Sequence, residues 1–184
     1  MGLVDRLKEK FDITETWLGY ELHPETPVAG ISLARRFSAQ RAAGLYDNIR
    51  ARGTELGLEF GRLALLSNSR FALEAGEYAR DMGRYEAYHE RMFRAYFTEL
   101  QDIGNLDVIS AVASDSGLDA TGLRETLRER RYAKRREEVR EEAESRFISG
   151  VPTFIVNDRR QIIGAQPLDI FEDLFRRLEA EQTS

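Results

Sequence analysis

The segment SGVPTFIVNDRRQIIGAQ, from Ser149 to Gln166, constrains the fold more than any other part of the chain. Two short runs of strand-forming residues, Thr153–Val156 and Gln161–Gly164, stand on either side of the turn-forming pair Asn157-Asp158. This pattern predicts a β-hairpin that begins directly after a Val-Pro step. The proline after the hairpin suits the first turn of a helix, and the amphipathic sequence LDIFEDLFRRLEAE predicts a closing helix.

Between about Leu33 and Phe147 the apolar residues recur at helical spacing instead. The predicted helices are LARRFSAQRAAGLYDNIRA, SRFALEAGEYARDM, YEAYHERMFRAYFTEL, LDVISAVASDSG and two more that reach about Phe147. Gly83 is predicted to end the second, Asn105 to open the fourth and Gly117 to end it, and Asp119 or Thr121 to open the fifth. We expect the aromatic stripe from Tyr85 to Phe97 to lie in the core of this block. In the segment Arg128–Arg146, glutamates balance the arginines at helical spacing, which predicts a solvated helix.

The front of the chain predicts a helix end followed by a strand. Residues 3–10 carry apolar side chains on one side of a helix, and Phe11–Leu22 is rich in β-branched and aromatic residues. Pro24 and Pro27 end this strand and open a linker, because neither can donate to a ladder. The sequence therefore predicts an α/β unit made of residues 1–27 and 148–184, interrupted by an all-helical insertion over residues 28–147.

Composition excludes several classes of protein. A net charge of −5 and a pI near 5.3 argue against a nucleic-acid partner. No apolar stretch approaches the length of about 18 residues that a membrane span needs. The first residues are not a secretory signal, so we expect a cytoplasmic protein. The chain has no cysteine, and its histidines, His23 and His89, are far apart, so we expect no disulfide, no metal site and no cofactor.

The order of these elements resembles the DsbA-like thioredoxin superfamily, in its cytoplasmic branch of polyketide-biosynthesis dithiol–disulfide isomerases. The resemblance covers nearly the whole chain through WLGYELHPETPVAG, LSNSRFALEAGEYARDMG, HERMFRAYFTELQDIGNLDVISAVASDSGLD and GVPTFIVNDRRQIIGAQP. It implies an α/β, thioredoxin-like fold with a large helical insertion. It also implies that the Val151–Pro152 bond is cis and that Gly150, Val151, Pro152 and Thr153 form a substrate-binding loop, in which Val151 pairs with an extended peptide.

The front of the chain departs from that family. Its members begin with a strand and then place a Cys-Pro-x-Cys-type motif at the N-terminus of the first helix, whereas this sequence starts inside that helix. We therefore expect the fold to lack its first strand and its redox motif, to have no catalytic residue and to be inactive as it stands. A start placed after a cysteine or selenocysteine motif would explain the departure.

Three functions remain open on this basis. The first is a truncated thiol–disulfide oxidoreductase, the second a redox-dead peptide-binding module, and the third a relative of the kappa-type glutathione-dependent isomerases or transferases. The resemblance implies an extended peptide or a thiol-containing molecule as substrate. The absent strand would lie between the strands at Thr14–Leu22 and Thr153–Val156, so its loss leaves open edges that recruit other chains. We therefore expect either direct closure of the gap or, in preference, a homodimer in which an element of one chain fills or covers the gap in the other, with Trp17, Phe154 and Ile155 near the junction.

Overall fold

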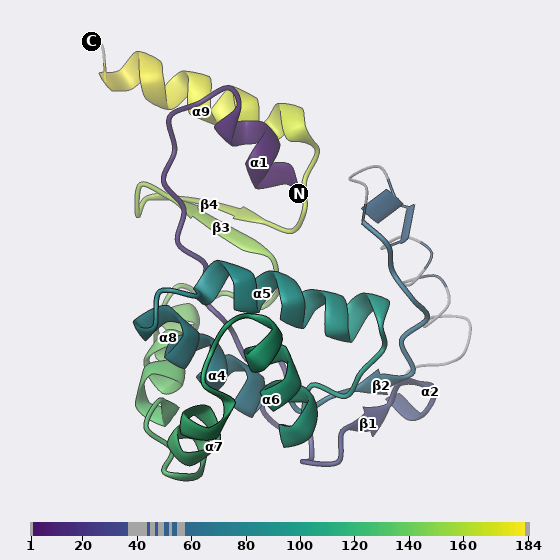
Figure 1. The fold of residues 1–184 in the computed structure, drawn as a ribbon. Helices are drawn as coiled ribbons and strands as arrows, with labels where there is room; N and C mark the ends of the chain where they lie inside the picture. Colours follow the sequence, from purple (N-terminus) through teal and green to yellow (C-terminus); the bar gives the residue numbers. More distant parts are fainter. Residues whose placement is uncertain are drawn as a thin grey trace.

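The computed structural model describes residues 2–36, 44, 47, 50, 51, 53, 54 and 58–182. One part of the fold contains both termini and consists of two helices, α1 (Leu3–Lys8) and α9 (Leu168–Gln182), beside a two-stranded hairpin (Figure 1). The other part is a block of helices. A long linker after α1 and a short connection before the hairpin join the two parts (Figure 1).

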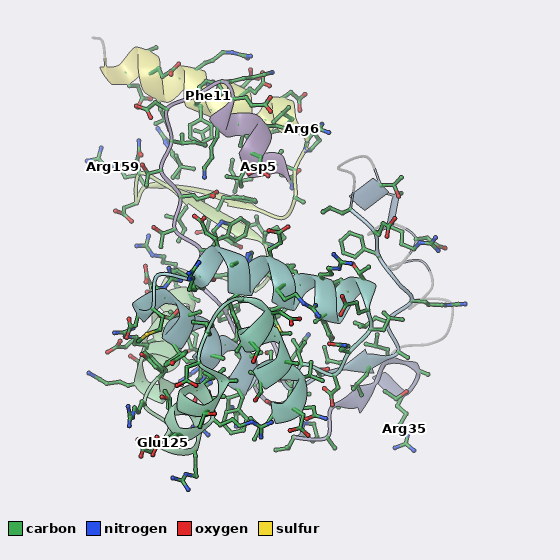
Figure 2. All side chains as sticks on the ribbon, viewed as in Figure 1. Asp5, Arg6, Phe11, Arg35, Glu125 and Arg159 are labelled. Atoms are coloured by element: carbon green, nitrogen blue, oxygen red, sulfur yellow. The ribbon has the colours of Figure 1, made fainter. Side chains whose placement is uncertain are left out.

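The hairpin has the form that the sequence predicts. Strand β3 (Thr153–Val156) pairs antiparallel with β4 (Arg160–Ile163), one residue earlier than the predicted second strand. Asn157 and Asp158 have φ values of 51° and 56°, a left-handed conformation that these residue types tolerate. Arg159 lies at the tip, away from the helical block (Figure 2).

Helices α1 and α9 pack against each other and carry the hairpin. The ring of Phe11, which is labelled in Figure 2, lies 5.3 Å from that of Phe175. Phe154 of β3 meets Phe171 of α9 in a T-shaped contact at 4.8 Å. Phe171 is only 1% exposed. These aromatic pairs form the core of this small part of the fold.

The helical block contains α4 (Arg70–Asp81), α5 (Tyr85–Phe93), the π-helix η1 (Arg94–Thr98), α6 (Leu106–Asp115), α7 (Ala120–Arg128) and α8 (Ala133–Ser145). Helix α4 lies at its centre and contacts α5, α6, α7 and α8 (Figure 1). The buried core consists of apolar side chains from α4 to α7, including Ala75, Ala79, Ile109, Val112 and Leu123.

The predicted helix ends are confirmed where capping residues mark them. The Asn105 side chain accepts a hydrogen bond from the Asp107 N–H at 2.8 Å, and Asp119 does the same for Thr121 at 2.9 Å. Gly83 and Gly117 follow α4 and α6 with φ values of 66° and 76°, which residues with a side chain rarely adopt. These ends were readable because each depends on one local residue type.

The strand predicted over Phe11–Leu22 is wrong. This stretch contains no strand, and the described sheets pair only β1 with β2 and β3 with β4. Its β-branched and aromatic residues fit a sheet surface, but none of the strands that the structure describes forms a ladder with it. The stretch instead runs as an unpaired linker from α9 towards α5 (Figure 1).

The insertion is helical but not entirely so. A two-residue ladder joins β1 (Ile31–Ser32) to β2 (Leu65–Leu66), and such short strands leave no periodic signal in the sequence. Helix α2 (Leu33–Arg36) begins the first predicted helix of the block, most of which lies outside the described residues. Among the helices described, none is both long and apolar enough to span a bilayer.

Candidate functional site

The predicted substrate-binding residues form the loop that connects α8 to β3. The Val151–Pro152 peptide bond is cis. The Thr153 hydroxyl donates to the Gly150 carbonyl at 2.7 Å, and the Gly164 N–H donates to the Pro152 carbonyl at 2.7 Å. The loop is therefore tied to itself and to the end of β4. The Val151 side chain is 54% exposed and is available to another molecule.

The hydrogen bond between Gly164 and Pro152 also fixes which way the backbone of β3 points. It makes these two residues a hydrogen-bonded pair, and such pairs alternate with non-hydrogen-bonded ones along an antiparallel ladder. Thr153 and Ile155 therefore occupy non-hydrogen-bonded positions, and their N–H and C=O groups point away from β4. Since no described strand pairs with β3 on that side, this edge is open to strand addition.

A row of rings along α5 lies close to the linker. The His89 ring lies 5.6 Å from Tyr85, 4.5 Å from Phe93 and 5.0 Å from Trp17, measured between ring centroids. The expectation that the whole aromatic stripe is core is thus wrong. Tyr88 and its neighbours on one face are buried, whereas Phe93 on the other face is 51% exposed. A 16-residue run with rings on both faces cannot bury all of them in a single core.

Burial sets the charge of His89. Desolvation lowers the pKa of its imidazole below the ordinary 6.5, because burial disfavours the charged form. The charge on Glu15 opposes this effect and that on Arg80 adds to it. The ring therefore stays neutral near pH 7 and packs as an aromatic group in the row.

We expect stability to fall when the protein is acidified from about pH 7 to about pH 5. Because the folded state binds a proton on His89 less readily than the unfolded state, this contribution is complete above the ordinary pKa and is lost as pH falls below it. Denaturant midpoints measured across this range by the emission of Trp17, the only tryptophan, would show the loss. The variant His89→Phe should remove that part of the pH dependence, and an unchanged pH profile in this variant would contradict the assignment.

Helix α8 confirms part of the prediction of a solvated helix. Its exposed pairs include Lys134 with Glu138 at 3.2 Å and Arg140 with Glu137 and Glu144. Arg136 differs, since only 12% of its side chain is exposed and it bridges two buried carboxylates. Arg136 stands among the glutamates of α8 in the same pattern as the other arginines of this helix. The sequence therefore contained no signal that Arg136 would be buried between two carboxylates. Among the described residues, no group of three or more acidic or histidine side chains could hold a metal ion.

Comparison with known proteins agrees with this architecture. The family model described as a DSBA-like thioredoxin domain matches residues 4–176. The uncharacterized protein YwbO of Bacillus subtilis (strain 168) is 29% identical over 164 residues, which is 88% of this chain and 80% of that protein. The crystal structure of the probable DsbA oxidoreductase SCO1869 from Streptomyces coelicolor matches with a TM-score of 0.80 and 22% identity, over 88% of this chain and 74% of that one. The chain belongs to the DSBA-like thioredoxin domain family.

Proposed function

We propose that this chain is the substrate-holding part of a thiol–disulfide oxidoreductase and that it does not catalyse exchange by itself. The observation that carries the proposal is the proline loop with its open β3 edge, in a chain that has no cysteine. Membership of the family and the fold shared with a probable DsbA oxidoreductase support the reaction class. A chain without disulfides also suits the cytoplasm, where we place it.

In this proposal the loop and the strand edge act as a template for an extended peptide. The backbone of Val151, and beyond it the outward-facing groups of Thr153 and Ile155, pair with the peptide by strand addition. Exchange then needs a thiolate that attacks one sulfur of a disulfide, forms a mixed disulfide and releases the other sulfur as a thiolate. Residues 1–184 supply no such group, so the thiol comes from another source.

The pure protein should give no turnover above the uncatalysed rate in an insulin-reduction assay with dithiothreitol. The thiolate is the nucleophile in this chemistry, and none of the side chains of the chain can replace it. A cysteine-containing thioredoxin assayed in parallel confirms that the reagents work. Turnover by the cysteine-free chain would overturn the proposal.

A peptide-binding module without any redox partner is the second candidate. The same open edge favours it, because strand addition depends on backbone groups and not on a thiol. The two candidate functions differ in whether the bound peptide must contain a cysteine. A redox role requires cysteine-containing peptides to be the functional ligands, whereas a simple binding module retains its full affinity when serine replaces the peptide cysteine. No observation on the described residues favours glutathione chemistry of the kappa type.

We also propose that the protein without a bound peptide is a homodimer in which one chain covers the open edge of the other, so that a peptide and the partner chain compete for this edge. Buried backbone groups without partners cost about 1–3 kcal/mol each, and an unpaired edge that directly follows the exposed Val151 attracts another chain. Sedimentation velocity at low micromolar concentration should give the mass of a dimer. A compact monomer at that concentration would contradict this assembly.

A further inference from the structure

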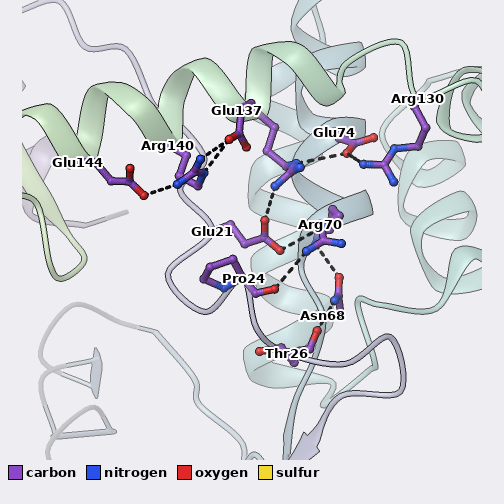
Figure 3. Close-up of polar contacts among 11 residues, drawn as sticks. Glu21, Pro24, Thr26, Asn68, Arg70, Glu74, Arg130, Glu137, Arg140 and Glu144 are labelled. Atoms are coloured by element: carbon purple, nitrogen blue, oxygen red, sulfur yellow. Dashed lines mark hydrogen bonds and ion pairs between the residues drawn. The ribbon is translucent and has the colours of Figure 1, made fainter.

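The linker between the two parts of the fold is held in an unusual way. It makes no ladder with any described strand, although it runs across the space between α9 and the helical block (Figure 1). Apart from the contact of Trp17 with His89, its contacts come from polar side chains of α4 and α8 and of the segment before α4 (Figure 3). These contacts concentrate on the stretch from Trp17 to Thr26.

Glu21 is the centre of these contacts. It is 3% exposed, and its carboxylate forms ion pairs with Arg136 of α8 and, at 3.3 Å, with Arg70 of α4 (Figure 3). Arg136 continues to Glu74 of α4, which is fully buried, at 3.3 Å. Arg130 reaches the same oxygen of Glu74 at 2.8 Å. The arginines thus connect a buried charge on the linker to a buried charge inside the block.

The backbone of the linker is held at the same place. Arg70 donates to the Pro24 carbonyl at 3.1 Å, and the Asn68 side chain donates to the Thr26 carbonyl at 2.6 Å (Figure 3). Carbonyl groups that would pair with a neighbouring strand in a sheet are here bound by side chains. The linker therefore has a fixed position although it lacks a strand partner.

Because these ion pairs are buried, breaking one of them while the others stay in place is unfavourable. Removing one partner of a buried ion pair leaves the other charge without compensation, which is strongly destabilising. Glu21 and Arg136 lie 115 residues apart in the chain, so their pairing also closes a long loop. The linker leaves the block only when Glu21 separates from both arginines, so the loss of either arginine favours its release.

Helix α8 connects this cluster to the proline loop. Arg136 lies in its first half, and its last turn runs directly into the loop, with the Ile148 N–H donating to the Ala143 carbonyl at 2.8 Å. The other end of the linker is bound to α9, where Lys10 meets Glu172 at 2.6 Å. Helix α8 therefore bears on both connections between the two parts of the fold. One connection follows it directly, and the other is the linker that its Arg136 holds.

We propose that Glu21, Arg70 and Arg136 form a latch that sets the position of the part carrying the proline loop relative to the helical block. When the latch is closed, the linker is fixed at both ends and the two parts keep one relative placement. When it is open, the linker still joins the two parts but no longer fixes their placement, and they move about the short connection after α8.

Because the chain has no cysteine, two cysteines can be introduced and spin-labelled without removing any native one. Spin labels on Glu125→Cys of α7 and Arg177→Cys of α9 report the separation of the two parts, because both sites are exposed and Glu125 lies at the far side of the block from α9 (Figure 2). When the labelled chain is diluted in an excess of unlabelled chain, so that only distances within one chain contribute, electron–electron double resonance should give one narrow distance distribution with Glu21 present. The variant Glu21→Gln should broaden it and shift it to longer distances, while Glu138→Gln, an exposed change on α8, should leave it unchanged.

The outcomes separate a latch from a merely stabilising contact. A folded Glu21→Gln protein with the same narrow distribution overturns the proposal. If that variant does not fold, Arg70→Met decides, because it removes one of the two arginines and leaves Arg136 in place. Broadening in Arg70→Met with the helical circular dichroism retained supports the latch, and a narrow distribution in it contradicts the latch.

Discussion

Replacing Phe171 by alanine should destabilise the part of the protein that carries the proline loop by about 3–5 kcal/mol. The side chain is 1% exposed, and its ring lies 4.8 Å from that of Phe154 in β3. The change removes the aromatic contact between α9 and the hairpin and leaves a cavity there. Few other side chains fill this small core, so the structure cannot close the cavity cheaply.

Urea unfolding followed by circular dichroism measures this effect. Arg177→Ala on the same helix is the matched control, because an exposed substitution should change the free energy of unfolding by less than about 0.5 kcal/mol. A loss below about 1 kcal/mol for Phe171→Ala would mean that the hairpin does not depend on α9 for its position.

Replacing Ile109 by alanine should cost about 2–5 kcal/mol in the free energy of unfolding. This side chain is 0% exposed and lies in the cluster that α4, α5, α6 and α7 share. Truncation removes its packing contacts and leaves a cavity among helices that are held by several other contacts. Leu106→Ala, at a position 39% exposed on the same helix, should cost clearly less. Equal losses in the two variants would contradict the position assigned to this core.

Comparing the two variants tests whether the chain is divided into two units, one made of residues 1–27 and 148–184 and the other of residues 28–147. This division stays a prediction. If the two parts unfold separately, Phe171→Ala should lower one transition and Ile109→Ala the other. If the latch couples them into one cooperative unit, both variants should shift a single transition.

The sequence predicted the elements that depend on local residue types. Asn157 and Asp158 marked the hairpin turn, and Asn105 and Asp119 marked two helix starts, because each acts through its own backbone neighbourhood. The proline loop, from Gly150 to Thr153, was instead predicted from the resemblance to the family. The role of this loop in substrate binding stays a prediction.

Long-range relations could not be predicted in this way. The residues over Phe11–Leu22 have a strand-like composition, but composition does not show whether a partner strand is present. Arg136 looks like any other arginine of α8, yet it pairs with Glu21 from a distant part of the chain. The open side of β3 follows only from the register of the hairpin, which the sequence does not specify.

Binding of an extended peptide at the β3 edge is the most direct test of the central claim, that this chain holds a substrate strand without reacting with it. Amide spectra of nitrogen-15-labelled protein should be recorded while a reduced, extended, cysteine-containing peptide is added. The amides of Thr153 and Ile155 should shift strongly, since their N–H groups face the open edge, and the peptide should be recovered unmodified. Ile155→Pro should weaken binding, because it removes an outward donor and no hydrogen bond to β4. Peptide binding that leaves Thr153 and Ile155 unshifted, or that is unaffected by Ile155→Pro, would contradict the claim.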